Sequence, residues 1–95
     1  MEFEWDPVKA SLNLKDHKVS FGEAATVFGN PLSVTFPDPD HSYDEYRFIT
    51  IGDSIDGRLL LIAHTDRGDI IRIISAREAT KRERKYYEEE SQSGK

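Results

Sequence analysis

The chain of 95 residues has no cysteine, so neither disulfides nor a thiolate nucleophile nor a thiolate metal site can be part of it. It also lacks a long hydrophobic run, because the longest, residues 59–63, is far shorter than the ~20 residues of a membrane span. No basic segment followed by an apolar one opens the chain, and we therefore expect no secretory signal. These absences predict a small, soluble, cytoplasmic protein.

What the chain does contain is enough apolar material for one modest core. Hydrophobic residues make up 37% and aromatic residues 11% of the sequence, and 95 residues are too few for two independent cores. Charged residues reach 33% but are mixed in sign, which argues against disorder. We expect a single domain over residues 1–95, with its core at about 2–90 and a frayed C-terminus at 91–95.

The net charge of −5 is unevenly distributed. Residues 38–57 carry one Arg against six Asp and Glu, whereas residues 58–87 carry eight Lys and Arg against four Asp and Glu, a net charge of +4. A basic C-terminal third on an acidic protein offers one surface to a polyanion. A solvated basic helix would account for the same charges, and the charges alone leave both interpretations open.

Local signals predict two helices near the N-terminus. Asp6 precedes a proline and fits an N-cap for a helix that ends near His17. Ser20 and Glu23 have the spacing of a capping box, which predicts a short second helix. Residues 29–31 are Gly, Asn and Pro and should end that helix.

Strand patterns dominate the middle of the chain, after a short alternating segment at residues 3–5. Four further strands are predicted, with a turn at 66–69 between the last two; they span residues 32–36, 47–51, 58–65 and 70–75. The order β-α-α-β-β-β-β-α, including a final helix, defines an α+β fold with a small antiparallel sheet.

The last helix has two possible starts. Ser75 with Glu78 and Thr80 with Glu83 both fit the capping-box spacing. We favour Thr80, because the last strand can then continue through Arg77. The helix would run from residue 81 to about residue 90.

Two arginines near the end of the last strand are candidate site residues. Arg72 interrupts an apolar strand, which is costly unless its face is open or its charge is paired. It could hold a phosphate on an open face, or it could pair with a carboxylate such as Glu45 or Asp69. Arg77 leaves the strand and has less reason to be structural.

Histidines give no metal signal. His64 alternates with Leu60 and Ile62, which is typical of a core histidine, although a proton carrier remains the alternative. The three histidines lack metal-ligand spacing, and we expect neither a metal nor a cofactor.

Basic and aromatic residues gather in the last helix. Lys81, Arg84 and Lys85 share one face, and such groups suit RNA because cations bind phosphates and rings stack on bases. At least one of Tyr86 and Tyr87 should instead pack the helix onto the sheet.

Over about residues 2–89 the sequence resembles the BrnT toxin family. The residues that carry the resemblance are Phe3, Glu4, Trp5, Asp6, Lys9, Asn13, His17, Val19, Ser20, Phe21, Glu23, Ala24, Val27, Phe28, Arg47, Ile51, Gly52, Arg58, Thr65, Arg67, Gly68, the string 72–77, Ala79, Glu83, Tyr87 and Glu88. The family often has glycine where this chain has Lys18, and the change costs a favourable helix C-cap.

The resemblance implies a RelE-like fold and a metal-independent endoribonuclease of a type II toxin–antitoxin module that inhibits translation. It implies that Arg72 and Arg77 stabilise phosphate and that His64 and Tyr87 transfer protons. The remaining expected RNA contacts are Arg47, Arg67, Lys81 and Arg84.

The implied partners are RNA, as substrate, and a BrnA-like ribbon-helix-helix antitoxin. Operator DNA would be bound only through the antitoxin, and the toxin–antitoxin complex could contain a dimer. No membrane partner is expected. The alternative function is a non-catalytic interaction module that docks an acidic partner protein through the basic C-terminal third.

Overall fold

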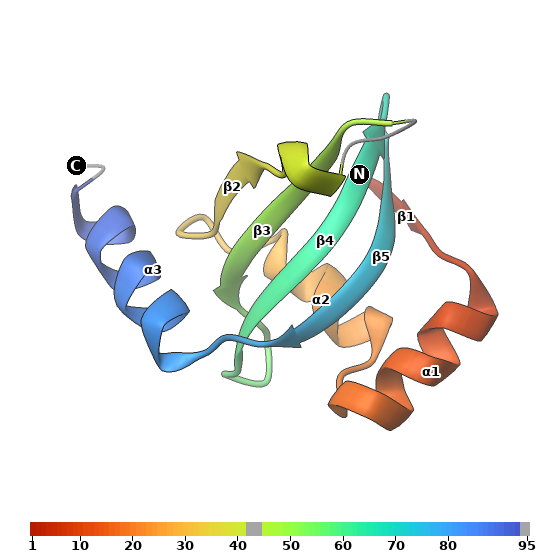
Figure 1. Cartoon of the computed structure of the whole chain (residues 1–95), viewed down its shortest axis with the longest axis horizontal. Coiled ribbons are helices and arrows are strands. Elements are labelled where there is room, and N and C mark those ends of the chain that lie inside the picture. Colours follow the sequence, from red (N-terminus) through yellow and green to blue (C-terminus); the bar gives the residue numbers. More distant parts are fainter. Residues whose placement is uncertain (42–44, 94–95) are drawn as a thin grey trace.

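A computed structural model describes residues 1–41 and 45–93 of the chain. Three helices and a short 3-10 helix accompany five strands in the order that the sequence predicted (Figure 1). The elements are β1 (Glu2–Glu4), α1 (Pro7–His17), α2 (Phe21–Val27), β2 (Val34–Pro37), η1 (Pro39–His41), β3 (Arg47–Asp53), β4 (Leu59–Arg67), β5 (Ile70–Glu78) and α3 (Lys81–Ser93).

The strands form one sheet in the order β1-β5-β4-β3-β2. Strands β2 to β5 are antiparallel neighbours, as the sequence predicted. The sheet as a whole is mixed, because β1 pairs parallel with β5, with Glu2 opposite Ile70. Two helices follow β1 before the chain returns to the sheet, and a helical connection of that kind permits parallel pairing.

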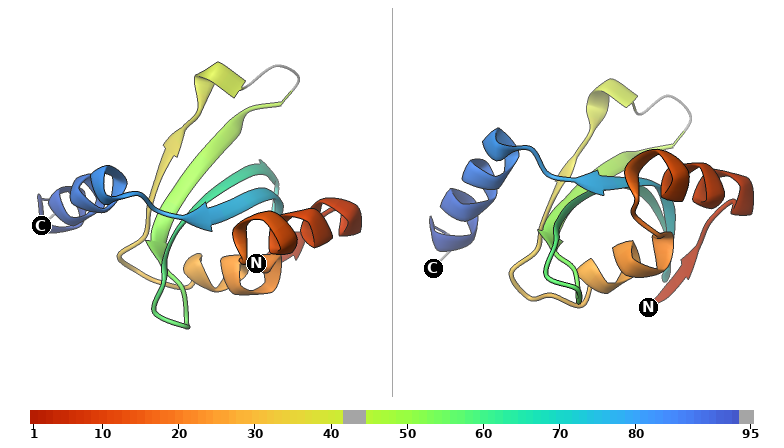
Figure 2. Two further views of the ribbon diagram at one scale, coloured as in Figure 1. Left: turned by 60° about the horizontal axis from the view of Figure 1, so that its bottom comes forward. Right: turned by 90° about the horizontal axis from the view of Figure 1, so that it is seen from below.

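The main core lies between one face of the sheet and α2. Val19, Phe21 and Val27 pack there against Leu60 and Ile62 of β4, all at most 2% exposed. Figure 2 shows α2 below this face, while α1 lies beside β5 and α3 lies at the other side of the sheet. The opposite face, which we call the open face, therefore has no helix over its centre among residues 1–41 and 45–93.

Helix α3 attaches to the rim of the open face. Tyr87 packs there with Ile51 and Leu59 in a small second core. The helix begins after Thr80, whose hydroxyl accepts from the backbone N–H of Glu83 at 3.2 Å, while a carboxylate oxygen of Glu83 accepts from the Thr80 N–H at 2.9 Å. This reciprocal capping box confirms the predicted start of α3.

Helix α1 caps the edge of β5 beyond the short β1. The buried side chain of Asn13 accepts from the Ala76 N–H at 3.0 Å and donates to the Ala76 carbonyl at 2.8 Å and to the Val19 carbonyl at 2.9 Å. The Asn13 amide thus forms the hydrogen bonds with the Ala76 backbone that a neighbouring strand would otherwise form. The helix ends at Lys18 in the left-handed conformation, with φ of 60°, where a glycine would be less strained.

Candidate functional site

Three polar residues form a row across the centre of the open face. In the sheet register Arg47 of β3 is opposite Thr65 of β4, and Thr65 is opposite Arg72 of β5. Directly opposed residues of neighbouring strands project from the same face of a sheet. The row therefore places a hydroxyl between two guanidinium-bearing side chains.

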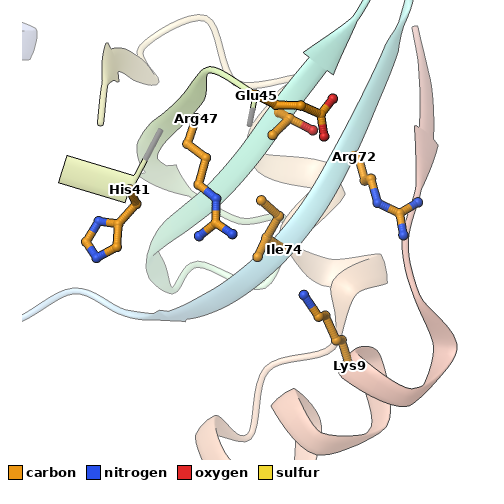
Figure 3. Close-up of a pocket in the computed structure, with 7 residues that line it drawn as sticks. Lys9, His41, Glu45, Arg47, Arg72 and Ile74 are labelled. Atoms are coloured by element: carbon orange, nitrogen blue, oxygen red, sulfur yellow. The ribbon is translucent and has the colours of Figure 1, made fainter. Parts of the chain in front are cut away.

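A cavity of about 200 Å³ surrounds this row. Lys9 of α1 lines it together with Arg47, Thr65 and Arg72, and the other lining residues are His41, Glu45 and Ile74. Figure 3 shows Lys9 and Arg72 on one side of Ile74, and Arg47 and His41 on the other. Three cationic side chains from three different elements thus meet in one small cavity.

Thr65 adds an unusual feature to the cavity. The residue is only 4% exposed, and its hydroxyl has no hydrogen-bond partner among the residues that the structure describes. Buried hydroxyl groups in folded proteins nearly always have a partner. Because Thr65 lines the cationic cavity, an oxygen of an anion bound there is a candidate partner for this hydroxyl.

The arginines near the cavity also have carboxylate neighbours. Arg72 forms its ion pair with Glu4 of β1, at 2.6 Å, and not with Glu45 or Asp69, although the Arg72 charge helps to lower the pKa of the nearby Glu45. Arg67 binds Glu45 through two nitrogens, at 2.7 and 2.8 Å. An anionic ligand therefore has to compete with Glu4 for the Arg72 guanidinium.

Arg77 lies on the open face as well, because of a β-bulge. Thr65 faces Arg72 while Leu61, four residues earlier on β4, faces Arg77, and the extra residue on β5 is Ile74. Arg77 donates to both oxygens of Glu83, each at 2.8 Å. Mainly through these hydrogen bonds, Arg77 lowers the pKa of Glu83 to about 2.

His64 is placed away from these residues. Its side chain is 1% exposed and projects toward α2, where its ring contacts Phe28 with 4.9 Å between the ring centroids. Nδ1 is 2.8 Å from a carboxylate oxygen of Asp66 and Nε2 is 2.7 Å from the hydroxyl of Thr50. Burial lowers the pKa of His64, although the Asp66 carboxylate opposes the shift.

The two tyrosines of α3 have different surroundings. Tyr87 is 6% exposed, packs in the second core and has a hydroxyl without a partner among the described residues. Burial raises the pKa of this hydroxyl. Tyr86 is 42% exposed and lines a second cavity of the open face together with Arg77. The prediction that one tyrosine docks the helix is confirmed, and that tyrosine is Tyr87.

The basic residues of α3 are divided between two sides of the helix. Lys81 and Arg84 are exposed, and neither lines the two open-face cavities described here. Arg82 lines the second cavity, next to Tyr86. The expected RNA contacts at Lys81 and Arg84 are thus not brought together with Arg47 and Arg72.

Sequence reasoning missed Lys9, His41 and Tyr86 as site residues. Lys9 was present only as a residue of the family resemblance, and His41 had no local signal. These residues lie on α1, η1 and α3, which only the tertiary fold brings to one face.

Among residues 1–41 and 45–93, no three His, Cys, Asp or Glu side chains are grouped to hold a metal ion. Within the same residues, no helix is long and apolar enough to cross a membrane.

The fold is that of an α+β protein with a helix-backed sheet, whose open face has a cavity lined by Lys9, Arg47 and Arg72. The chain belongs to the BrnT family: the family model for the ribonuclease toxin, BrnT, of type II toxin–antitoxin systems matches residues 5–83. Membership in such a family implies an antitoxin partner.

The fold is also similar to a solved structure, the crystal structure of the Brucella abortus ribonuclease toxin, BrnT. The two chains are 20% identical, with a TM-score of 0.67 over 85% of this chain and 99% of the Brucella chain. This likeness confirms the predicted α+β architecture. The comparison with curated proteins gave no match.

Proposed function

We propose that the open face cleaves RNA, with the scissile phosphate held in the cavity around Thr65. The observation that carries this proposal is the row Arg47, Thr65 and Arg72, closed on one side by Lys9. Arginine and lysine are the residues that bind phosphate, and a buried hydroxyl adds an uncharged donor. The family to which the chain belongs supports RNA as the source of that phosphate.

The proposed reaction uses the 2′-hydroxyl of the RNA as nucleophile. Its oxygen attacks the adjacent phosphorus, a P–O bond forms, and the bond to the 5′-oxygen of the next nucleotide breaks. The leaving 5′-oxygen takes a proton from solvent water, so the products are a 2′,3′-cyclic phosphate and a 5′-hydroxyl. Negative charge grows on the phosphate oxygens during the attack, and Arg47, Arg72 and Lys9 stabilise it.

Proton transfer needs a group inside the cavity, and we assign it to His41. Its Nδ1 is 3.1 Å from both oxygens of Asp38, so Nδ1–H donates to the carboxylate and Nε2 is left for the substrate. In that tautomer Nε2 takes the proton of the 2′-hydroxyl. His64 and Tyr87 are unsuited to this step, since one faces α2 and the other is enclosed in the second core.

The cations of the chain are sufficient for this chemistry, so we propose that cleavage proceeds without a metal ion and inhibits translation. We further propose that a BrnA-like ribbon-helix-helix antitoxin covers the basic surface of residues 58–87. Operator DNA would be bound through that antitoxin, with a dimer formed in the complex. Blocking the open face would exclude RNA by occupancy alone.

The test compares Lys9→Gln with Lys15→Gln. Both substitutions remove one lysine charge from α1, but only Lys9 lines the cavity. We expect Lys9→Gln to slow cleavage of a labelled RNA in excess chelator by about 10²-fold or more, and Lys15→Gln to have no effect. Equal rates for the two variants would contradict the assignment of the cavity.

A second variant tests the proton-transfer role. His41→Gln should slow cleavage of the labelled RNA and leave the affinity for an uncleavable RNA with a 2′-deoxy substitution at the cleavage site unchanged. Cleavage by His41→Gln at the wild-type rate would exclude His41 as the base. If the wild-type chain binds RNA but releases no cleaved product, the non-catalytic interaction module becomes the better explanation.

A further inference from the structure

The second cavity of the open face is larger and more apolar than the first, with a volume of about 580 Å³. Its floor consists of Ile49 and Ile51 of β3 and Leu61 of β4. Phe36 and Tyr86 line it as well. The strands provide a flat aliphatic surface, and two aromatic rings stand beside it.

This groove lies beside the cationic cavity on the same face of the sheet. Ile49 follows Arg47 by two residues on β3, so both side chains project from the same face about 7 Å apart along the strand. On β4 the side chains of Thr65 and Leu61 project from this face as well, and Leu61 lies opposite Arg77. A strand of RNA with its phosphate at Thr65 has its neighbouring base within reach of the groove.

The aromatic pair at the groove is fixed yet accessible. The Tyr86 ring meets the Phe36 ring edge to face, with centroids 5.9 Å apart, so Phe36 restricts its movement. Tyr86 is nevertheless 42% exposed, while its neighbour Tyr87 already anchors the helix. The docking of α3 therefore leaves Tyr86 available to a ligand.

The polar residues of the groove match the edges of a nucleobase. Arg82 supplies N–H donors, and Arg77 and Asp38 line the groove with their other contacts to Glu83 and His41 in place. A purely apolar peptide side chain could form no hydrogen bond with this polar rim. A base offers a flat ring to the aliphatic floor and both donors and acceptors at its edge.

We infer that the groove between β3 and α3 is a nucleobase-binding site that accepts the base next to the scissile phosphate, with Tyr86 as its principal contact. This inference rests on the proposed ribonuclease function for the phosphate at Thr65. It adds a site that selects for a base, in contrast to the cationic cavity, which would accept any phosphate. Base stacking on an aromatic ring tolerates all four bases, and the polar rim introduces preference among them.

The probes are adenosine 5′-monophosphate and ribose 5-phosphate, which differ only in the base. Titrated into the full chain, the nucleotide should shift NMR signals of Ile49, Ile51, Leu61 and Tyr86. Both probes should shift signals of Thr65. Ribose 5-phosphate should leave the groove signals unchanged.

Variants of Tyr86 measure its contribution. Tyr86→Ala should weaken binding of the nucleotide on the order of 10-fold and leave the affinity for ribose 5-phosphate unchanged. Tyr86→Phe keeps the ring and should bind nearly as the wild type does. Tyr46→Ala is the matched control, because Tyr46 is 82% exposed and does not line the groove.

The outcomes separate this inference from the proposed function. If Lys9→Gln abolishes RNA cleavage but Tyr86→Ala leaves nucleotide affinity and cleavage unchanged, the nuclease site stands and the base site is wrong. If nucleotide shifts the groove signals but the chain cleaves no RNA, the base site stands and the ribonuclease function fails. Groove signals that respond to an antitoxin peptide and never to nucleotide would overturn the inference in favour of a protein interface.

Discussion

His64 and Arg72 lie one register position apart on neighbouring strands, yet their side chains project from opposite faces of the sheet. Arg72 is paired with Thr65 and lines the cationic cavity, whereas His64 is paired with Ile73 and is buried against Phe28. The sheet therefore separates His64 from the cationic residues of the open face. Any proton transfer on the open face requires a different group, and His41 is the histidine that lines the cavity.

His64 belongs to a chain of hydrogen bonds that stabilises the core. With Nδ1 donating to Asp66, Nε2 accepts from the hydroxyl of Thr50, which in turn accepts from Thr35 at 2.7 Å. Replacing His64 with Gln should lower the free energy of unfolding by about 1–3 kcal/mol, since Thr50 loses a buried partner. RNA cleavage per folded molecule should not change, and denaturant titration beside a cleavage assay checks both. A loss of cleavage in fully folded His64→Gln would restore its catalytic role.

Burial of His64 should also make the free energy of unfolding depend on pH. The pKa of His64 is lowered in the folded protein from its ordinary value of 6.5, so the unfolded chain takes up a proton more readily. The stabilising contribution of neutral His64 is complete above pH 6.5 and is lost as the pH falls below it. The ring-proton NMR signals of His64 should thus titrate with a midpoint below pH 6.5. A midpoint at or above 6.5 would contradict this.

Tyr87 offers a direct comparison of a structural and a catalytic role. Because its buried hydroxyl has no partner among the described residues, Tyr87→Phe should leave stability unchanged or raise it by roughly 0.5–1 kcal/mol. Tyr87→Ala should instead cost about 3–5 kcal/mol, because it opens a cavity under α3. Cleavage should persist in Tyr87→Phe. If the ring is kept and cleavage disappears, the hydroxyl takes part in the reaction.

Local signals in the sequence were enough to predict most elements. The capping box at Thr80 is complete, because it depends on residues three positions apart. At Ser20 only half of the predicted box is present: the Ser20 hydroxyl accepts from the Glu23 N–H, but the Glu23 carboxylate binds Arg58 and Ser54 instead of the Ser20 N–H. Local signals did not predict that His64 would be buried on the core face while His41 would line the cavity of the open face. His41 reaches the cavity only because the fold places η1 beside Arg47. The residues next to His41 in the sequence give no sign of this placement.

The placement of Arg77 shows a second limit. Arg72 and Arg77 are five residues apart, so strict alternation would put their side chains on opposite faces. The bulge at Ile74 restores both to the open face. A bulge is set by the pairing of two strands, and the periodicity of one strand contains no sign of it.

Asn13 should prove more important for folding than its polar character suggests. Asn13→Ala leaves the N–H and carbonyl of Ala76 buried without their partners and should cost about 3 kcal/mol of unfolding free energy. Ser11→Ala, an exposed position of the same helix, should change it by less than about 0.5 kcal/mol. Urea denaturation of the two variants measures the difference. Similar midpoints would mean that water replaces Asn13 at the edge of β5.

Because of the ion pair between Glu83 and Arg77, the attachment of α3 to the sheet should weaken at low pH. The pKa of Glu83 is lowered from 4.5 to about 2, first by the hydrogen bonds from Arg77 and further by the Thr80 N–H. A carboxyl group with a depressed folded pKa stabilises the protein above its unfolded pKa. That stability is lost as the pH falls from about 4.5 towards 2.

Glu83→Gln removes the titrating group while keeping its size. It should lower the unfolding free energy at pH 7 by about 1–2 kcal/mol, a value reduced for the partial exposure of both side chains. Below pH 4.5 the stability curves of the wild type and of the variant should converge, since protonated Glu83 no longer attracts Arg77. Glu89→Gln, on the exposed side of α3, is the matched control and should run parallel to the wild type. If Glu83→Gln also ran parallel at every pH, the pair would contribute nothing to the attachment of the helix, and the apolar contacts of Tyr87 and Tyr86 would hold α3 to the sheet.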